Sequence, residues 1–279
     1  MRLRQLAMPA LAALGVAAII VAERRRPLRP GLAPLRREAR HLFMGALCLA
    51  TMQSLETPIC RALARRVEAR RQGLAQALPA PRLPRDAAAF LLLDYTMYVW
   101  HVLTHKAPAL WRLHLVHHVD SELSATTALR FHFVDMAVSL PWRVAQVRLL
   151  GASPRAFAAW QNFFFASVLF HHSNLRLPER LERRLAWLLT TPRMHGIHHQ
   201  AARDRTDSNW SSGISWWDRL HGTFRLDVPQ TDVRIGVPAY PEELGIDELL
   251  QLPFEPNPDA WTPEPHAPEG VERRKETHT

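Results

Sequence analysis

Long uncharged stretches alternate with arginine-rich connections along the first third of the chain. Residues 6–22 form an uncharged run of 17, which as a helix rising about 1.5 Å per residue only just reaches across the roughly 30 Å hydrocarbon core of a bilayer. Residues 42–55 form a shorter apolar run, which fits a re-entrant segment as well as a short span. Residues 87–105 are apolar at first and carry His101 and His105 near their end. This pattern predicts membrane helices, the third of which brings its histidines to the membrane–water boundary.

The first run has a rival interpretation, a cleaved signal peptide. Arg2 and Arg4 give the chain a basic start, as in such peptides, but no Ala-x-Ala cleavage site precedes the charges of residues 23–26. We therefore favour a retained membrane anchor.

Two further apolar stretches, 133–150 and 156–170, are separated by the helix-breaking sequence Gly-Ala-Ser-Pro at 151–154, which predicts an αα-hairpin. Strand signals are weak, and apolar runs of helical length dominate. We expect an all-α fold in which integral membrane helical hairpins carry a histidine-lined helical cap at the membrane–water boundary. The basic segment 61–85 resembles a helix lying on a lipid surface, with a solvated basic loop as the alternative.

The composition fits a globular or membrane protein of one large or two small domains. The chain has 279 residues, 47% of them hydrophobic, and a formal net charge of +9, which excludes collagen-like and disordered chains. Cys48 and Cys60 are the two cysteines, too few for a disulfide scaffold. Seven arginines fall between residues 23 and 41 and seven between 61 and 85. The positive charge therefore flanks apolar runs, which favours membrane helices over nucleic-acid binding, and the equal numbers leave the orientation open.

We divide the chain into three parts. Residues 1–86 contain the predicted membrane anchor helices and a basic connection, and residues 87–228 contain the histidine clusters. Residues 229–279 carry nine prolines between Pro229 and Pro268, which predicts a soluble extension that covers the main body and becomes disordered near 262–279.

Histidine spacing is the most informative chemical feature of the sequence. Eleven of the fifteen histidines lie between residues 101 and 199, and most of these fall into three sets spaced i, i+4 or i, i+3, i+4. On a helix each set lies on one face and presents several imidazoles to a common point. With one more histidine between the sets, the candidate metal ligands are His101, His105, His114, His117, His118, His172, His195, His198 and His199.

Nine imidazoles exceed what one tetrahedral zinc ion uses and suggest two metal ions. Imidazole suits Zn, Cu, Fe and Ni. The Glu-x-x-His motif of soluble di-iron bundles is absent from the chain, so the predicted site consists of neutral nitrogen ligands. Near a bilayer these cost less to desolvate than ionised carboxylates. Isolated histidines such as His41, His221 and His266 are interpreted as ordinary surface or core residues.

Several ordered motifs between residues 87 and 224 resemble the fatty acid hydroxylase superfamily, also called the sterol desaturase family. They are DYTMYVWHVLTH at 94–105, LWRLHLVHH at 110–118, RFH at 130–132, HSN at 172–174, TPRMHGIHH at 191–199, and DSNW with WDRLHGT within 207–223. The chain departs from the usual family pattern at Val102, Asp135, Trp210 and His221, and none of these departures removes one of the nine histidines.

The resemblance implies an integral membrane, multi-pass, non-haem di-iron monooxygenase or desaturase, with residues 87–228 as its catalytic domain. Such an enzyme uses two iron ions (Fe2+/Fe3+), O₂ and an external electron donor to hydroxylate or desaturate a lipid C–H bond in a sterol, a fatty acyl chain or a related apolar substrate. We expect it in the bacterial inner membrane, with the histidine site facing the cytoplasm. No iron–sulfur cysteine cluster or flavin motif is present in the sequence, so a ferredoxin or cytochrome b5-like protein is the expected donor. The donor would dock on a basic surface, with contact to lipid headgroups as the alternative role of these arginines, which are Arg183, Arg184, Arg193, Arg203 and Arg205.

Residues beside the histidine boxes are possible further ligands or hydrogen-bond partners of the metal-bound rings. Metal-bound histidines usually donate their second N–H to a carboxylate or carbonyl, and among the carboxylates we prefer Asp94 and Asp207. The full set is His132, His171, Asp94, Asp120, Asp135, Asn174, Asp207 and Asp218.

Two other function classes remain as alternatives. A membrane zinc hydrolase needs a general-base carboxylate, as in the motif His-Glu-x-x-His, which the sequence lacks. A non-enzymatic haem-binding or lipid-binding membrane protein would use histidine pairs far apart in sequence rather than contiguous sets.

Overall fold

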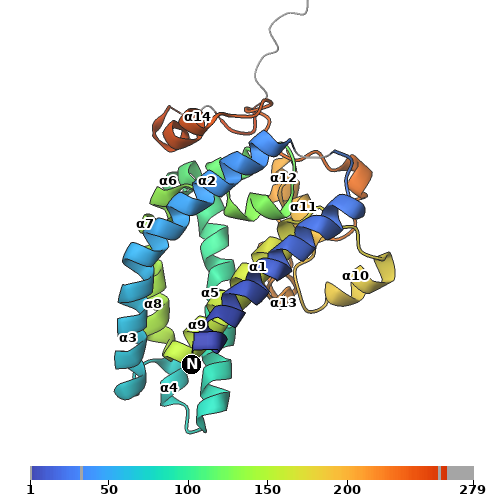
Figure 1. Ribbon diagram of the computed structural model, residues 1–279. Coiled ribbons are helices and arrows are strands. Elements are labelled where there is room, and N and C mark those ends of the chain that lie inside the picture. Colours follow the sequence, from blue (N-terminus) through green and yellow to red (C-terminus); the bar gives the residue numbers. More distant parts are fainter. Residues whose placement is uncertain (1, 32–33, 257–258, 263–279) are drawn as a thin grey trace, which may run out of the picture.

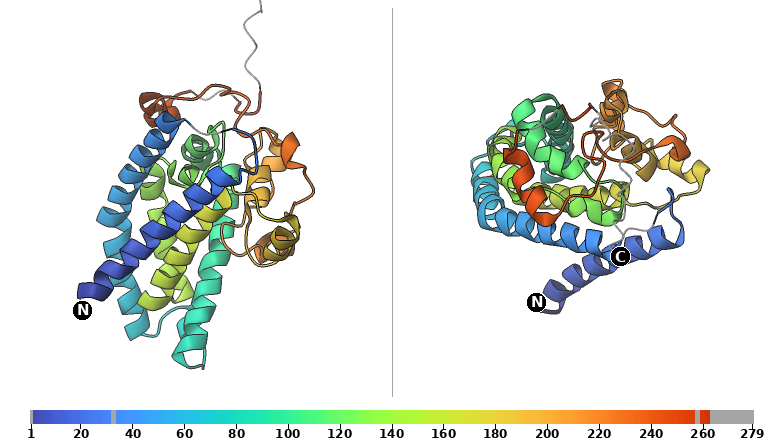
Figure 2. Two further views of the ribbon diagram at one scale, coloured as in Figure 1. Left: turned by 45° about the vertical axis from the view of Figure 1, so that its right-hand side comes forward. Right: turned by 90° about the horizontal axis from the view of Figure 1, so that it is seen from above.

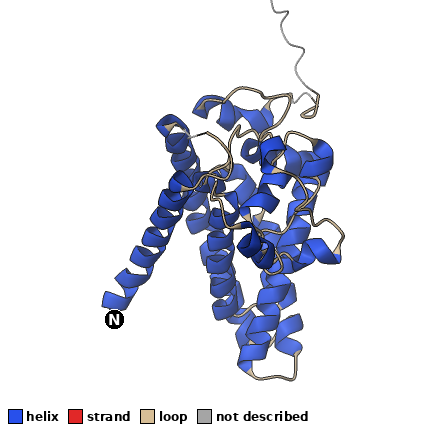
Figure 3. Ribbon diagram, turned by 90° about the vertical axis from the view of Figure 1, so that its right-hand side faces the viewer, coloured by secondary structure: helices blue, strands red, loops and turns tan. Residues whose placement is uncertain are grey.

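Long helices form a bundle that carries a cap of short helices and loops at one end (Figures 1 and 2). This computed structural model describes residues 2–31, 34–256 and 259–262, with side chains described from residue 14 onward. Within these residues the regular secondary structure is helical, with isolated bridges such as Pro27 to Leu175 (Figure 3). The predicted all-α class is therefore confirmed for the described part of the chain.

The bundle and the cap divide the helices between them. The bundle contains α1 (Arg2–Arg25), α2 (Leu35–Thr51), the π-helical turn η1 (Met52–Glu56), α3 (Thr57–Ala69), α4 (Leu74–Ala77), α5 (Arg82–Lys106), α8 (Leu140–Leu150) and α9 (Pro154–His172). The cap contains α6 (Pro108–His118), η2 (Ala125–Leu129), α7 (Phe133–Val138), α10 (Glu179–Leu185), α11 (Pro192–His198), α12 (Arg203–Thr206), α13 (Trp216–Leu220), η3 (Gln230–Asp232), α14 (Ile246–Gln251) and η4 (Leu252–Phe254). Of these, α10 and α13 extend from the cap along the side of the bundle (Figures 1 and 2).

Helices α2 and α3 form one continuous rod from Leu35 to Ala69. The π-helical turn joins them just before Pro58, which has no N–H to donate to the preceding turn of the rod. The re-entrant interpretation of 42–55 is therefore wrong, because this run is the middle of a long helix. The interpretation of 61–85 as one surface helix is also wrong, because the segment comprises the end of α3, the short α4 and the start of α5.

Helix α5 is the central element of the bundle. It packs against α8 and α9, and its Leu93 is buried with Phe157 and Trp160 of α9. Among the described helices, α5 is the one that is long and apolar enough to cross a membrane by length and composition. Its last turn enters the cap, so the bundle positions the first two histidines directly.

The predicted turn between α8 and α9 lies at residues 151–153. Gly151 has a φ of 78° and Gly73 a φ of 86°, and the two backbones touch so closely that a Cβ on Gly73 would overlap Gly151. Ser153 begins α9 by accepting a hydrogen bond from the amide of Ala156 at 3.0 Å. Both α8 and α9 pack on α5, and α8 also packs on α3.

The C-terminal segment packs on the cap. Val237, Leu249 and Leu252 are buried in one apolar cluster with Met44 of α2 and Leu115 of α6. The stretch 262–279, where we expect disorder, lies outside the described residues apart from Thr262. The described part of this segment thus covers α6, which carries three of the candidate ligands.

Candidate metal centre

Four segments deliver the histidines to the junction of bundle and cap. The last turns of α5 carry two, α6 carries three, the end of α9 carries two, and α11 with its C-cap residue carries three. All of these rings are buried except that of His105, which is partly exposed. Helical spacing explains why each segment turns its rings to one side.

Ring nitrogens from these segments form two neighbouring groups. In each group of four, the nearest ligand atoms all lie within 4.8 Å of one another. A third set, His118 with His198 and His199, joins the two groups. The first group is His101, His105, His114 and His118, and the second is His117, His172, His195 and His199. The nine residues of these sets are the nine candidate ligands selected from the sequence.

Backbone carbonyls determine which nitrogen of several rings carries the proton. The Nδ1 atoms of His101 and His198 lie 2.7 and 2.9 Å from the carbonyl oxygens of Trp210 and Ser208. A carbonyl oxygen can only accept, so Nδ1 is the donor and the lone pair of a neutral ring lies on Nε2. This is the arrangement in which histidine binds a metal through Nε2.

The second group shows the strongest sign that a cation belongs there. His172 and His117 also direct Nδ1 at carbonyl oxygens, those of Val168 at 2.8 Å and Arg130 at 3.2 Å. Their Nε2 atoms nevertheless lie 2.9 Å apart. Two neutral rings in this state would oppose lone pair to lone pair, which a cation between them would relieve.

The other nitrogen separations agree with a metal ion. The Nε2 atom of His195 lies 2.9 Å from that of His172 and 3.0 Å from that of His199. Two nitrogens bound at about 2.1 Å and at a right angle to one ion would lie about 3.0 Å apart. The Nε2 atoms of His105, His114 and His118 in the first group, and of His198 in the joining set, are buried without a hydrogen-bond partner. The residues present therefore fit metal ions at both groups.

Protonation of the rings does not supply the positive charge that the closely spaced Nε2 atoms require. Burial lowers the pKa of His195 and His199 well below the ordinary histidine value, and neighbouring imidazoles lower it further. The pKa of His118 falls for the same two reasons. The rings are thus held neutral and available as ligands.

Aromatic side chains enclose the histidines. The ring of Trp210 lies 4.6 Å from that of His105 and 5.2 Å from that of His198, between centroids. Phe131 stacks on His117 at 4.1 Å, and Trp111 lies 4.8 Å from His105. Phe131 and Trp111 were not predicted as site residues, although both stand within the quoted motifs.

The preferred carboxylates contact groups other than the ligand rings. Asp94 accepts hydrogen bonds from the amide of Ile214 at 3.0 Å and from the indole of Trp217 at 2.7 Å, which ties α5 to α13. Asp207 is half-buried and forms an ion pair with Lys106 at 2.5 Å. The Nδ1 atoms of four candidate ligands contact backbone carbonyls instead. Cap loops supply these carbonyls for His101, His117 and His198, and α9 itself supplies the one for His172.

Asp218 organises the loop that supplies one of these carbonyls. Its carboxylate accepts from the amides of Trp210 and Ser211 at 2.8 and 3.1 Å. The carbonyl of Trp210 in turn receives the Nδ1 hydrogen of His101. Asp218 therefore acts on the site through the backbone of the 209–211 loop rather than as a ligand.

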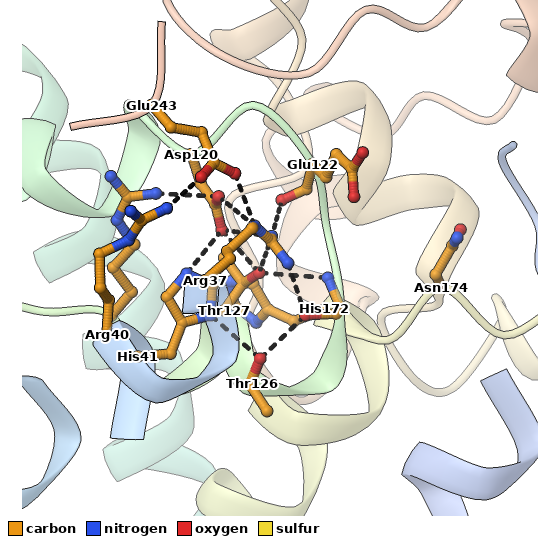
Figure 4. Close-up of polar contacts among 12 residues, drawn as sticks. Arg37, Arg40, His41, Asp120, Glu122, Thr126, Thr127, His172, Asn174 and Glu243 are labelled. Carbon is orange, nitrogen blue, oxygen red and sulfur yellow. Dashed lines mark hydrogen bonds and ion pairs between the residues drawn. The ribbon is translucent and has the colours of Figure 1, made fainter. Parts of the chain in front are cut away.

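Asp120 is the centre of a buried charged network (Figure 4). It is fully buried and bonds Arg37 through both carboxylate oxygens, at 2.8 and 2.6 Å, and Arg130 at 2.8 Å. Burial alone would raise the pKa of Asp120, but Arg130 and Arg37 hold it below the ordinary value. Because the carbonyl of Arg130 accepts from His117, the network connects α2 to the second histidine group. Arg37 was not assigned from the sequence.

The remaining candidates lie around the centre. His132 stands outside both groups and caps α7 by accepting from the amide of Val134 at 3.2 Å. His171 is buried with its ring 4.0 Å from that of His195, and Asp135 is buried in α7. Asn174 bonds both backbone groups of Arg29 at 2.9 Å.

An open pocket of about 400 Å³ reaches the first group from the cap side. His105 contributes to its wall together with Trp111 and Trp261, whose rings stack 5.8 Å apart. Lys106, Arg112 and Arg203 also line it. The pocket gives the solvent side of the cap access to one candidate ligand.

The family model for fatty acid hydroxylases matches residues 87–223, which contain every histidine of both groups. This chain belongs to the fatty acid hydroxylase family. The family match thus coincides with the segment that builds the candidate metal centre.

Relatives that match part of the chain are lipid hydroxylases and monooxygenases. The chain is 28% identical over 148 residues to ornithine lipid hydroxylase OlsE of Rhizobium tropici, covering 53% of this chain and 44% of the relative. It is 30% identical to alkylglycerol monooxygenase of Xenopus tropicalis, covering 51% and 30%, and 29% identical to human cholesterol 25-hydroxylase, covering 48% and 49%. The match spans less than half the length of each relative. No solved structure matches the chain.

Proposed function

We propose that this member of the fatty acid hydroxylase family is a membrane-bound, O₂-dependent di-iron oxidoreductase that hydroxylates or desaturates a lipid C–H bond. The observation that supports it most directly is the pair of adjacent four-imidazole groups at the junction of bundle and cap. Nine neutral nitrogen ligands are enough for two ions and leave room for O₂. Two iron ions bound there would supply O₂ activation and C–H oxidation.

The protein would contribute orientation and an aromatic cover over the rings. The carbonyls of Trp210, Ser208 and Val168 hold the rings of their partner histidines with Nε2 turned inward. Trp210 and Phe131 cover rings of both groups, and His105 at the open pocket is the one partly exposed ring. A rigid nitrogen cage of this kind keeps its geometry when metal and substrate bind.

The bundle supports a multi-pass membrane location. Besides α5, the rod α2–η1–α3 has an uncharged stretch from 42 to 55, bounded by Arg40 and by Glu56, which is buried against Arg143, and it turns Leu42, Leu49 and Ile59 outward. From residue 41 to 60 the rod measures about 30 Å, the thickness of a bilayer core. We place the protein in the bacterial inner membrane with the histidine cap on the cytoplasmic side.

The substrate we propose is an apolar or amphipathic lipid. The names of the relatives support this class, since they refer to an ornithine lipid, an alkylglycerol and cholesterol. The candidate centre lies where α5 leaves the predicted membrane region, so a lipid lying in the bilayer could present a C–H bond to it.

Electrons would come from a ferredoxin or cytochrome b5-like protein. The pocket beside His105 supports docking from the cap side, because Arg112 and Arg203 line it as basic groups in addition to Lys106, which is paired with Asp207, and Asp259 is its other acidic lining residue. An acidic donor would be steered to such a surface.

The experiment that tests the proposed function compares lipid extracts of cells that express the wild-type protein with those of cells that express the His118→Ala variant. We expect a lipid in the wild-type extract that has gained one oxygen or lost two hydrogens and that is missing from the variant extract. Identical lipid profiles, with both proteins present in the membrane, would contradict the proposal.

A further inference from the structure

Three arginines line an open pocket of about 450 Å³ between the end of α1 and the segment that leads into α10. They are Arg25, Arg26 and Arg176, and the rest of the wall is Pro27, Leu177 and Pro178. The pocket lies outside the metal centre and the proposed oxidation chemistry does not use it.

The acidic side chains around this pocket already have other partners. Glu38 pairs with Arg24 at 2.6 Å, Glu179 with Arg183 at 3.5 Å, and Glu182 with Arg193 at 2.7 Å. Among the described residues, Arg25, Arg26 and Arg176 have no carboxylate within ion-pair distance. Three like charges around one hollow repel each other unless an anion occupies it.

The walls of the pocket are held together by hydrogen bonds that leave the three guanidinium groups largely free. The amide of Arg176 donates to the carbonyl of Arg26 at 2.7 Å, and the amide of Leu28 donates to the carbonyl of Asn174 at 2.7 Å. Asn174 adds two more bonds to the backbone of Arg29. The one described hydrogen bond of a guanidinium is from Arg176 to the carbonyl of Leu28, at 3.5 Å. The backbone that carries the three exposed arginines is therefore held in place, and planar guanidinium groups match the oxygens of a phosphate.

The neighbouring surface indicates where that phosphate comes from. An elbow made of α10, the following turn and α13 exposes Trp187, Leu188, Trp216 and Leu220, with exposed fractions of 63%, 55%, 46% and 69%. In Figures 1 and 2 the elbow lies alongside the bundle, farther from the cap end than the end of α1. Exposed tryptophans beside arginines are typical of the membrane interface.

The elbow has a defined structure. The indole of Trp216 donates to the carbonyl of Trp187 at 2.8 Å, and the guanidinium of Arg219 lies 4.0 Å above the Trp187 ring. Apolar side chains held outward in this way fit the acyl region, while the arginine pocket, nearer the cap, fits the headgroup region.

We propose that the pocket of Arg25, Arg26 and Arg176 binds the phosphate of an anionic membrane phospholipid. The site joins α1 to the loop that follows α9, four residues beyond His172, so the bound lipid would stabilise the position of the end of α9. The proposal does not depend on the oxidation reaction.

The test measures lipid retention by the purified full-length protein in detergent, using native mass spectrometry. The probes are phosphatidylglycerol, which is anionic, phosphatidylcholine, which is zwitterionic, and inorganic phosphate. The variant replaces Arg25, Arg26 and Arg176 with Gln. The matched control replaces Arg65, Arg66 and Arg70 with Gln, which removes the same charge from the exposed end of α3. Circular dichroism and metal content are measured to check that both variants are folded.

We expect wild type and control to retain phosphatidylglycerol in preference to phosphatidylcholine. Each arginine removed from the pocket should weaken retention about fivefold, so the triple variant loses most of it, and millimolar inorganic phosphate should not displace the lipid. Equal retention of the two lipids, or equal loss in both variants, would overturn the proposal. Binding of inorganic phosphate that depends on the same arginines, without preference for phosphatidylglycerol, would also overturn it and identify a site for free phosphate.

Discussion

The Nε2 atoms of His117 and His172 lie 2.9 Å apart although both rings direct their Nδ1 atoms at backbone carbonyls. Neutral rings in this state have no hydrogen to place between the two nitrogens. Burial lowers the pKa of His117 and opposes an imidazolium. A bound cation resolves the conflict, which makes this pair the most direct structural sign of a metal centre.

Loss of one ring of this pair should lower metal content. We expect His172→Ala to lose at least one bound metal per chain, because it removes one of the four rings of the second group. His132→Ala is the matched control, since His132 caps α7 outside both groups. Metal analysis of the two purified variants is the measurement. Equal metal content in both variants would argue against the second group as a ligand set.

His118 and His199 should be the most sensitive positions. Each belongs to one group of four and to the set that joins the groups, so alanine at either should abolish turnover and lower metal content. Membrane insertion should be unchanged, because neither ring lies in the long bundle helices. Product yield measured beside the membrane-bound amount of protein checks this, and normal yield from both variants would refute the ligand assignment.

Asp120→Asn should destabilise the fold strongly. It leaves Arg130 buried without its counter-charge and Arg37 with only the partly exposed Glu243 at 3.8 Å, a change that costs about 3–5 kcal/mol. Asp207→Asn removes a half-exposed pair with Lys106 and should cost less than about 1 kcal/mol. The free energies of unfolding of the two variants in detergent, from denaturant titration, decide this. Similar small losses would mean that the Asp120 network is not a structural support.

Gly213 should not tolerate a side chain. A Cβ there would overlap the carboxylate of Asp94 and the ring of Phe163, so Gly213→Ala should cost about 1–3 kcal/mol by overpacking and loosen the contact between α5 and α13. Gly15→Ala is the control, because its Cβ meets no atom within 4 Å and alanine favours a helix. Melting temperatures of both variants test the expectation, which an unchanged value for Gly213→Ala would contradict.

The outward face of α2 should lie in the hydrocarbon region. Leu49→Cys should resist a charged maleimide in intact membranes, whereas Leu74→Cys, on the short α4 at the end of the bundle, should react. Cys48 and Cys60 are buried and should add no background. Equal labelling rates at the two introduced cysteines would exclude α2–η1–α3 as a span.

Local patterns predicted which histidines lie together, because the spacing that brings them together is local. A spacing of i, i+3, i+4 constrains three rings to one face, and the structure brings all nine chosen histidines into the two groups and the set that joins them. Helix α5 and the turn at Gly151 were predictable for the same reason, since run length and turn residues are read along the chain.

Contacts between distant segments were not predictable in this way. Arg37 reaches Asp120 across 83 positions, and a single chain carries no signal for that pairing. The Nδ1 atoms of His101 and His198 contact the carbonyls of residues 210 and 208 rather than Asp94 or Asp207. The sequence could not predict these partners, because every residue has a backbone oxygen. The apolar run of 42–55 ends at Glu56, but the helix continues to Ala69 through a π-helical turn that the run does not predict.

The central claim is that two redox metals bind the paired histidine groups. Iron and zinc per chain, measured on protein purified anaerobically from iron-supplied cells, test it most directly. We expect about two iron ions per chain, with the number falling in His172→Ala and unchanged in His132→Ala. One zinc ion per chain, or no transition metal at all, would contradict the proposed di-iron centre.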